Sequence, residues 1–390
     1  IKLTSFSWFY TDGSSNPESM KKEIAEAREK LKTIQDRKET RRLKSKIKKY
    51  ESRYDTMPNP LTFMAWTYQF SGYPVGPALE LREYLRCTRT ASPSGVLPGL
   101  SKFFAGFGFL VLFQILSSFA PVGAPRFWNC THAPCIPMSN ELPQGILNLP
   151  GGNILSSEFA SNSFIVRILY LFVAGIIVRA RYYFAWLTAE AAYNVAGFGY
   201  DANAKADGPS AFFNLFPKWN TMANVDIVRL ETSTTLKLMT LWNFKTQRWL
   251  VSTVYKRVLE AFPGVSRTVP VMATYFISAL WHGIYPGYYV CFMGAAFASV
   301  TLPGFYKKFP GDGDHLSLKG GFVSILGRVI KWLVTFAVLD FVVLGLLFLS
   351  LDHTYAAQQA FYFYMYPLVI VLMIVFMLVP KAKKKKEKDA

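Results

Sequence analysis

The sequence predicts an all-α integral membrane protein with several membrane-spanning helices. Hydrophobic residues make up 51% of the 390 residues and charged residues only 17%, whereas a soluble protein carries about 25% charged residues. The apolar residues gather in blocks close to the ~20 residues that a spanning helix needs. Between Arg267 and Lys307 there is no Asp, Glu, Lys or Arg at all. We therefore expect one membrane domain over 1–390, which further helices could precede because the chain begins at Ile1 rather than Met.

The elements are expected in the following order. Residues 18–54 predict a long, charged cytosolic helix, because Glu and Lys neighbours lie three or four positions apart. Residues 61–79 follow as a re-entrant or broken helix, since Gly and Pro interrupt an apolar stretch. Residues 182–200 are only half apolar, and residues 225–262 are amphipathic. Membrane-spanning helices are expected over 99–120, 164–180, 268–283, 286–305, 322–350 and 356–380.

The net charge of +18 is typical of nucleic-acid-binding proteins, but its distribution argues against such a partner. Residues 21–53 carry fourteen Lys or Arg against six Asp or Glu, and six further lysines lie between Lys381 and Lys388. Both runs flank membrane segments, where positive charge marks the cytosolic side and contacts anionic lipids. We expect no nucleic-acid partner and a basic cytosolic tail over 381–390.

The positions of the charges predict a lumenal loop over 121–163. Cys130 and Cys135 are close enough in sequence to form a disulfide in an oxidising lumen, and Asn129 begins a glycosylation sequon. Free thiols and an unused sequon remain equally compatible with the sequence. Lys386 and Lys388 in the tail resemble a lysine-based retrieval signal, which predicts the endoplasmic-reticulum membrane.

His282 is the best candidate for chemistry in the sequence. It lies within the charge-free block, and an ionisable side chain at membrane depth usually persists because it has a function. A neutral imidazole both accepts and donates protons near pH 7. The alternative is a structural histidine whose ring binds a backbone carbonyl between helices. The other histidines, His132, His315 and His353, lie in polar surroundings and are expected at the surface.

Asn243 is the second candidate, in the run Leu241-Trp242-Asn243-Phe244. Its amide could orient a substrate or donate to an oxyanion. Arg248 follows on the cytosolic side, where it could bind the phosphates of an anionic cofactor or belong to a solvated face.

Several other mechanisms have no signature in the sequence. There is no G-x-S-x-G nucleophile elbow and no glycine-rich phosphate loop before a Lys-Ser/Thr pair, and the four cysteines show no metal-ligand spacing. We therefore expect no metal and no resident cofactor. The economical mechanism is direct transfer between two bound substrates, with a general base that takes a proton from one of them.

Two motifs resemble those of the membrane-bound O-acyltransferases, in particular their lysophospholipid acyltransferase branch. Trp281-His282-Gly283 followed by Tyr285-Pro286-Gly287-Tyr288-Tyr289 is similar to the signature of that family, and its broad-specificity plant and fungal type is the most similar. Trp242-Asn243 with Lys245-Thr246 and Trp249-Leu250 is similar to the asparagine motif of the branch. Further similar stretches are Val75-Gly76-Pro77 with Glu83-Tyr84, Tyr182-Tyr183-Phe184-Ala185-Trp186, Gly197-Phe198-Gly199, and Asn224-Val225-Asp226 with Glu231.

The resemblance implies a multi-helix fold that encloses a catalytic chamber, with acyl-CoA as a co-substrate from the cytosol and a lysophospholipid from the bilayer. His282 would be the general base for the free glycerol hydroxyl of the lysolipid, and Asn243 would position the substrates or stabilise charge on the thioester oxygen. The further substrate-binding residues implied are Trp242, Trp281, Tyr285, Tyr288, Arg248 and Lys245.

Two other functions remain possible at this point. One is an acyltransferase of the same family that acts on a sterol, a diacylglycerol or a protein. The other is a transporter that uses His282 as a proton relay, although such proteins carry further intramembrane carboxylates or repeats, and Asp340 is the only acidic residue evident in a late helix. Neither the lysolipid head group, nor the acyl chain, nor the oligomeric state follows from the motifs.

Overall fold

The computed structural model describes residues 2–34, 36–51, 53–54, 56–70, 76, 79–89, 92–119, 154–202, 215–311 and 313–378. The chain divides into two compact units, one formed by 1–103, 188–206 and 214–223 and the other by 104–187, 207–213 and 224–390. Most of the expected lumenal loop and the whole basic tail lie outside the described residues. The proposed disulfide and sequon at Asn129, Cys130 and Cys135 therefore stay predictions.

Over the described residues the secondary structure is helical apart from one isolated bridge between Ser233 and His315, which confirms the all-α class. In the described part of the chain, three helical stretches are long and apolar enough to cross a membrane, or four if one bent helix pair counts as a span. They are Val96–Ser117, Pro286–Lys308 and Phe322–Phe348, and the bent pair is Leu351–Ala360 with Met365–Leu378.

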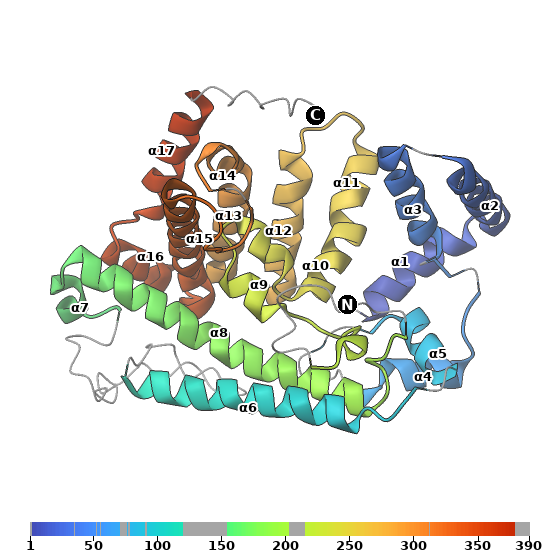
Figure 1. Ribbon diagram of the computed structural model, residues 1–390. Coiled ribbons are helices and arrows are strands. Elements are labelled where there is room, and N and C mark those ends of the chain that lie inside the picture. Colours follow the sequence, from blue (N-terminus) through green and yellow to red (C-terminus); the bar gives the residue numbers. More distant parts are fainter. Residues whose placement is uncertain are drawn as a thin grey trace. The chain divides into compact units, whose positions relative to one another are not determined.

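The first unit contains α1 (Lys2–Ser14), α2 (Pro17–Thr33), α3 (Arg37–Glu51), α4 (Pro60–Thr67) and α5 (Leu81–Arg89). The single helix predicted over 18–54 is thus two helices that pack against each other (Figure 1). Ile34 has extended backbone, and β-branched residues such as Thr33 and Ile34 are poor helix formers. Asp36, a favoured helix-capping residue, directly precedes α3. The helix-supporting charge pairs act locally and cannot prevent such a break.

Within the interrupted stretch 61–79, the described residues form one short helix, α4. Asn59 caps α4 by accepting from the amide of Thr62 at 2.8 Å, and α4 ends at Thr67. The indole of Trp66 donates to the carbonyl of Leu79 at 2.7 Å. Trp66 is part of an apolar core with Phe6, Phe9, Tyr54 and Leu81.

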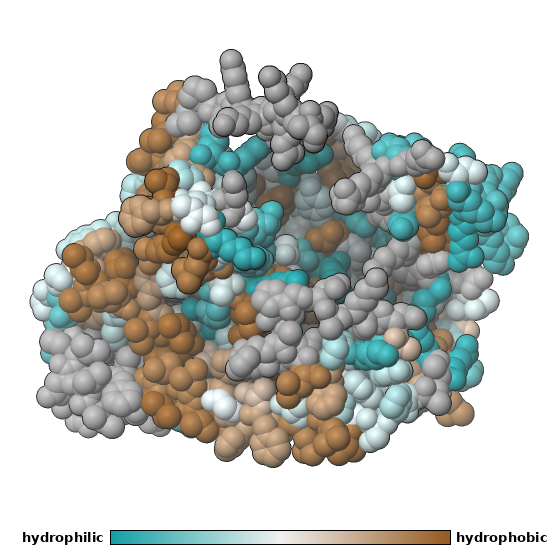
Figure 2. Space-filling view, viewed as in Figure 1, coloured by the Kyte–Doolittle hydropathy of each residue, from teal (hydrophilic) through white to brown (hydrophobic). Residues whose placement is uncertain are grey.

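The second unit holds most of the apolar helices. Two long helices, α6 (Val96–Phe119) and α8 (Phe164–Val195), are shared by the two units, and α7 (Ser157–Ser161) precedes α8. The later helices are α12 (Thr268–His282), α13 (Pro286–Thr301), α14 (Pro303–Lys308), α15 (Phe322–Phe348), α16 (Leu351–Ala360) and α17 (Met365–Leu378). Hydrophobic side chains cover the outer faces along α6 and beside α16, whereas hydrophilic ones cover α2 (Figure 2). Such exposed apolar faces fit contact with lipid.

Two of the expected membrane spans differ in the structure, and the helix that contains residues 164–180 is not among the candidate spans found in the described residues. Residues 164–195 form one continuous helix, without the interruption near residue 181 that the composition indicated. Residues 356–380 were expected as one span, but α16 and α17 meet at an angle of 64°. Tyr362 and Phe363 at this joint have left-handed backbone, with φ of 54° and 50°. Arg167 of α8 donates to the carbonyl of Ala360 and stacks over the ring of Tyr362 at 4.5 Å.

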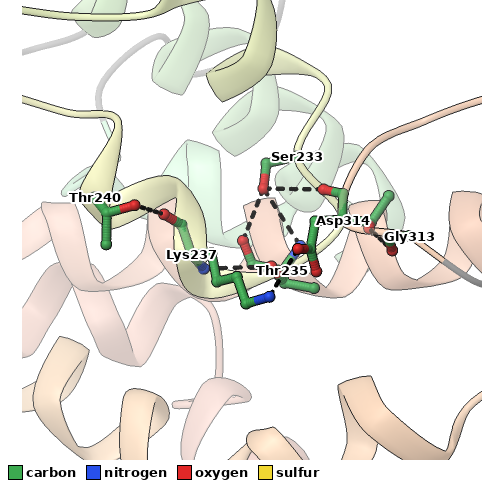
Figure 3. A network of polar contacts seen from close by, with 7 residues as sticks. Ser233, Thr235, Lys237, Thr240, Gly313 and Asp314 are labelled. Carbon is green, nitrogen blue, oxygen red and sulfur yellow. Dashed lines mark hydrogen bonds and ion pairs between the residues drawn. The ribbon is translucent and has the colours of Figure 1, made fainter. Parts of the chain in front are cut away.

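Residues 225–262 form a chain of short elements. They are α9 (Ile227–Glu231), the 3-10 helix η4 (Leu236–Thr240), α10 (Phe244–Leu250), the π-helical turn η5 (Val251–Tyr255) and α11 (Lys256–Ala261). The segment that leads into η4 is tied to the loop after α14 (Figure 3): the amide of Thr234 donates to the carbonyl of Asp314 at 2.8 Å, and Lys237 forms an ion pair with the Asp314 carboxylate at 2.7 Å.

Candidate active site

His282 is the last residue of α12, where the helix ends abruptly. Gly283 follows with φ 137° and ψ −174°, a conformation that side-chain-bearing residues rarely adopt. The glycine of the Trp-His-Gly motif therefore stops the helix directly after the histidine, and His282 projects from a helix end.

His282 is an exposed residue in the structure, and its imidazole contacts three aromatic rings on one side. Its centroid lies 4.7 Å from that of Trp281, 4.8 Å from Phe292 and 5.5 Å from Tyr288, and Tyr288 in turn contacts Tyr285 at 6.3 Å. Among the described residues the ring of His282 forms no hydrogen bond. The structural alternative required a carbonyl partner for this ring, and the described residues provide none.

The next motif residues place α13 tightly against α15. Pro286 occupies the first turn of α13, where its missing N–H costs nothing, and the amide of Gly287 donates to the carbonyl of Leu349 at 2.6 Å. A Cβ at Gly287 would lie 2.2 Å from the carbonyl oxygen of Gly345 on α15. The glycine thus allows the contact that holds the start of α13, and with it Tyr288 and Phe292, beside His282.

We expect Gly287→Ala to destabilise the protein and to reduce its activity with it, because α13 must move away from α15. Overpacking of this kind costs about 1–3 kcal/mol or more, measured as a lower midpoint of thermal unfolding in detergent. Gly108→Ala is the matched control, since no described heavy atom lies within 4 Å of a Cβ built on that helical glycine. Equal unfolding midpoints for the two variants would contradict the role given to Gly287.

Asn243 lies at the start of α10 in a left-handed conformation, with φ 44° and ψ 49°. Asparagine is one of the few residues that tolerate this conformation. It occupies the position that caps the helix, yet its side chain makes no capping hydrogen bond. The amide of Asn243 is therefore not used by its own helix and is available for another partner.

Trp242 anchors the segment through aromatic contacts with α8. Its ring centroid lies 4.6 Å from that of Trp186, 5.5 Å from Tyr182 and 6.1 Å from Tyr183. Such edge-to-face contacts favour one orientation of each ring. Trp242 thus packs on α8 while it stays partly exposed, and its role in substrate binding stays a prediction.

The fold brings His282 and Asn243 to the same end of a helix pair. The continuous run α10–η5–α11 turns back through residues 262–267 into α12, which packs against η5 and α11 (Figure 1). In such an antiparallel pair the first turn of α10 lies at the same end as the last turn of α12.

The two predicted cations follow directly after Asn243. Lys245 and Arg248 lie three positions apart on α10, so they share one face of the helix. The guanidinium of Arg248 is exposed and lies 4.8 Å above the ring of Phe244. Both cations thus belong to the same helical element as Asn243, in its first two turns.

Some residues around the site were not assigned to it from sequence. Phe292 lies four positions after Tyr288, and this helical spacing could have placed it beside His282. Tyr182 and Trp186 were noticed only as part of a similar stretch. Their contact with Trp242 joins residues far apart in the chain, and no local pattern reveals it.

Comparisons with known proteins agree with the motifs. Residues 145–309 match the family described as MBOAT, membrane-bound O-acyltransferase family, a stretch that includes both Asn243 and His282. The family resemblance drawn from the motifs is thereby confirmed.

Similar curated proteins come from animals and yeast. Membrane-bound glycerophospholipid O-acyltransferase 2 of Mus musculus is 27% identical over 318 residues, covering 79% of this chain and 54% of that protein. Membrane-bound glycerophospholipid O-acyltransferase 1 of Mus musculus is 31% identical over 202 residues, covering 52% of this chain and 37% of that protein. Lysophospholipid acyltransferase of Saccharomyces cerevisiae is 28% identical over 310 residues, covering 76% of this chain and 42% of that protein. The chain thus spans about half or less of the length of these relatives.

Proposed function

We propose that the protein transfers a fatty acyl group from acyl-CoA to the free glycerol hydroxyl of a lysophospholipid, and the match of residues 145–309 to the membrane-bound O-acyltransferase family supports this proposal. The observation that carries this proposal is the pair His282 and Asn243, one imidazole and one uncommitted amide at the same end of an antiparallel helix pair. The names of the similar proteins, glycerophospholipid O-acyltransferase and lysophospholipid acyltransferase, support the choice of acceptor.

In the proposed reaction His282 is the general base. Its ring accepts the proton of the lysolipid hydroxyl as that oxygen attacks the carbonyl carbon of the thioester. The C–S bond then breaks, the CoA thiolate leaves, and the proton held by the imidazole returns to the sulfur. The products are a diacyl phospholipid and CoA.

Asn243 acts on the acyl donor in this mechanism. As the hydroxyl attacks, negative charge develops on the thioester oxygen, and the side-chain N–H groups of Asn243 donate to it. Lys245 and Arg248 follow on the same helix and would bind phosphates of the CoA moiety. Trp281, Tyr285 and Tyr288 would contact the lipid, because the rings of Trp281 and Tyr288 touch that of His282 and the ring of Tyr285 touches that of Tyr288.

The proposal is tested by supplying radiolabelled oleoyl-CoA and a panel of acceptors to microsomes that contain the protein. We expect labelled phospholipid from lysophospholipids and none from cholesterol, diacylglycerol or a peptide. We also propose residence in the endoplasmic reticulum, so the activity should fractionate with a marker enzyme of that membrane. Label in a sterol, a triacylglycerol or a peptide would identify a different acceptor class, and the absence of any acyl transfer would overturn the proposal.

A further inference from the structure

The backbone around Asn243 is docked on a neighbouring segment. The amide of Asp226 donates to the carbonyl of Leu241 at 3.2 Å, and the amide of Phe244 donates to the carbonyl of Asn224 at 3.0 Å. These two hydrogen bonds flank Asn243 on both sides. The position of the Asn243 amide therefore follows the position of residues 224–226.

The segment 224–226 leads directly into α9, a helix of five residues that ends at Glu231. The Asp226 side chain caps α9 by accepting from the amide of Arg229 at 3.2 Å. Because a capped helical turn has little internal freedom, a displacement at Glu231 is passed back to 224–226, and from there to Asn243.

Glu231 is fixed by three interactions that reach two long helices. Its carboxylate oxygen Oε1 accepts from Nε of Arg179 at 2.8 Å and from the hydroxyl of Tyr183 at 2.5 Å, both on α8. Its backbone carbonyl accepts from the indole of Trp332 on α15 at 2.7 Å. Side chain and backbone of the same residue are thus held at once.

Arg179 is the centre of this arrangement. Its Nη1 donates to Asp340 of α15 at 2.7 Å, and its guanidinium lies 4.8 Å above the ring of Phe336. The close approach of α8 and α15 depends on Gly175, since a Cβ there would lie 2.3 Å from the Asp340 carboxylate. A buried cation with two carboxylates in an apolar domain is costly, so a role beyond general stability is worth testing.

We propose that Arg179 and Glu231 are positioning residues that set the location of the Asn243 amide in the proposed acyl transfer. The inference rests on the proposed function of Asn243. The guanidinium of Arg179 ties α9 to the membrane helices, and α9 carries the segment on which Asn243 is docked. A displacement of about 1 Å at a reacting group can cost on the order of 100-fold in rate, so loss of the pair reduces the rate of transfer more than the binding of either substrate.

The main test compares Glu231→Gln with Asp12→Asn in the purified protein, assayed with radiolabelled oleoyl-CoA and mixed lysophospholipids. The Arg53–Asp12 ion pair is a close match to Arg179–Glu231, because both pairs have an N–O distance of 2.8 Å. The side chains of Arg53 and Asp12 are 7% and 29% exposed, and those of Arg179 and Glu231 are 7% and 32% exposed. We expect Glu231→Gln to lower kcat by roughly 10- to 100-fold, with KM for acyl-CoA within about twofold. Asp12→Asn should leave kcat near the wild-type value.

A double variant separates positioning from general stabilisation. If Glu231 acts through Asn243, then Glu231→Gln should cause no further loss of kcat in an Asn243→Gly background. An additional loss in that background, or equal effects of Glu231→Gln and Asp12→Asn, would overturn the inference. The proposed function would survive such a result, because it depends on turnover by the wild-type protein alone.

Tyr183→Phe provides a second route if Glu231→Gln does not fold. It removes one hydrogen bond to the Glu231 carboxylate and keeps the ring against Trp242. We expect a smaller decrease in kcat, again with unchanged KM. Wild-type kcat in this variant, together with an unfolded Glu231→Gln, would assign the pair a structural role only and would contradict the proposal.

Discussion

His282→Ala should abolish acyl transfer in microsomes while the protein is still expressed and membrane-bound. General-base catalysis contributes about 10²- to 10⁴-fold to a rate, and no other described group with a similar function contacts the same aromatic cluster. His282 lies at a helix end, and among the described residues its ring contacts aromatic side chains. Removal of the ring should therefore affect the chemistry far more than the fold.

His282→Gln separates a base from a hydrogen-bonding group. Glutamine can donate and accept hydrogen bonds but cannot take a proton near neutral pH, so we expect it to be as inactive as alanine. His353→Ala is the control: that imidazole is exposed and its Nδ1 contacts the hydroxyl of Ser350 at 2.9 Å, near the start of α16. Acyl transfer is measured with labelled oleoyl-CoA, and expression by immunoblot. Wild-type turnover in either His282 variant would remove the histidine from the mechanism.

Asn243→Gly should inactivate the protein without destabilising it. The backbone at Asn243 is left-handed. Glycine adopts this conformation at least as readily as asparagine, whereas alanine in it destabilises the folded state by roughly 1–2 kcal/mol. Glycine therefore removes the amide and leaves the backbone unstrained. Loss of one oxyanion donor lowers kcat by about 10²- to 10³-fold, and we expect an effect of this size in the same labelled-lipid assay.

Two further variants separate the effect of the Asn243 side-chain amide from effects on backbone strain and helix capping. Asn243→Ala should lose both activity and thermal stability, because the strained backbone remains. Asn59→Ala, at an asparagine that does cap its helix, should lose about 1 kcal/mol of stability and keep its kcat. If Asn243→Gly turned over like the wild type, the left-handed backbone rather than the amide would be the feature that matters at this position.

The outline of the membrane helices could be predicted from the sequence because hydrophobicity is a local property. The charge-free block between Arg267 and Lys307 became α12, α13 and α14, and residues 322–350 became α15 almost to the residue. Helix breaks were harder to predict. The joint at Tyr362 and Phe363 is held by Arg167, which lies almost two hundred residues earlier in the chain.

In the candidate site, too, some features could be predicted from local sequence and others depend on tertiary contacts. His282 could be singled out because it is the one ionisable side chain in a long apolar block, and Asn243 because of its aromatic neighbours. Nothing local indicates that Asn243 has a left-handed backbone, or that Trp242 packs on Trp186. These features depend on how α8 and the segment before α10 meet in space.

The sequence alone thus determined the class of fold, the apolar segments and the identity of the two residues proposed for chemistry, since each of these follows from side-chain composition along a short window. The tertiary structure decided that α10 and α12 run antiparallel and that Arg179 joins Glu231 to Asp340. Ion pairs between residues 52 or 161 positions apart form only when the chain is packed, because their energies depend on distances that no local pattern encodes.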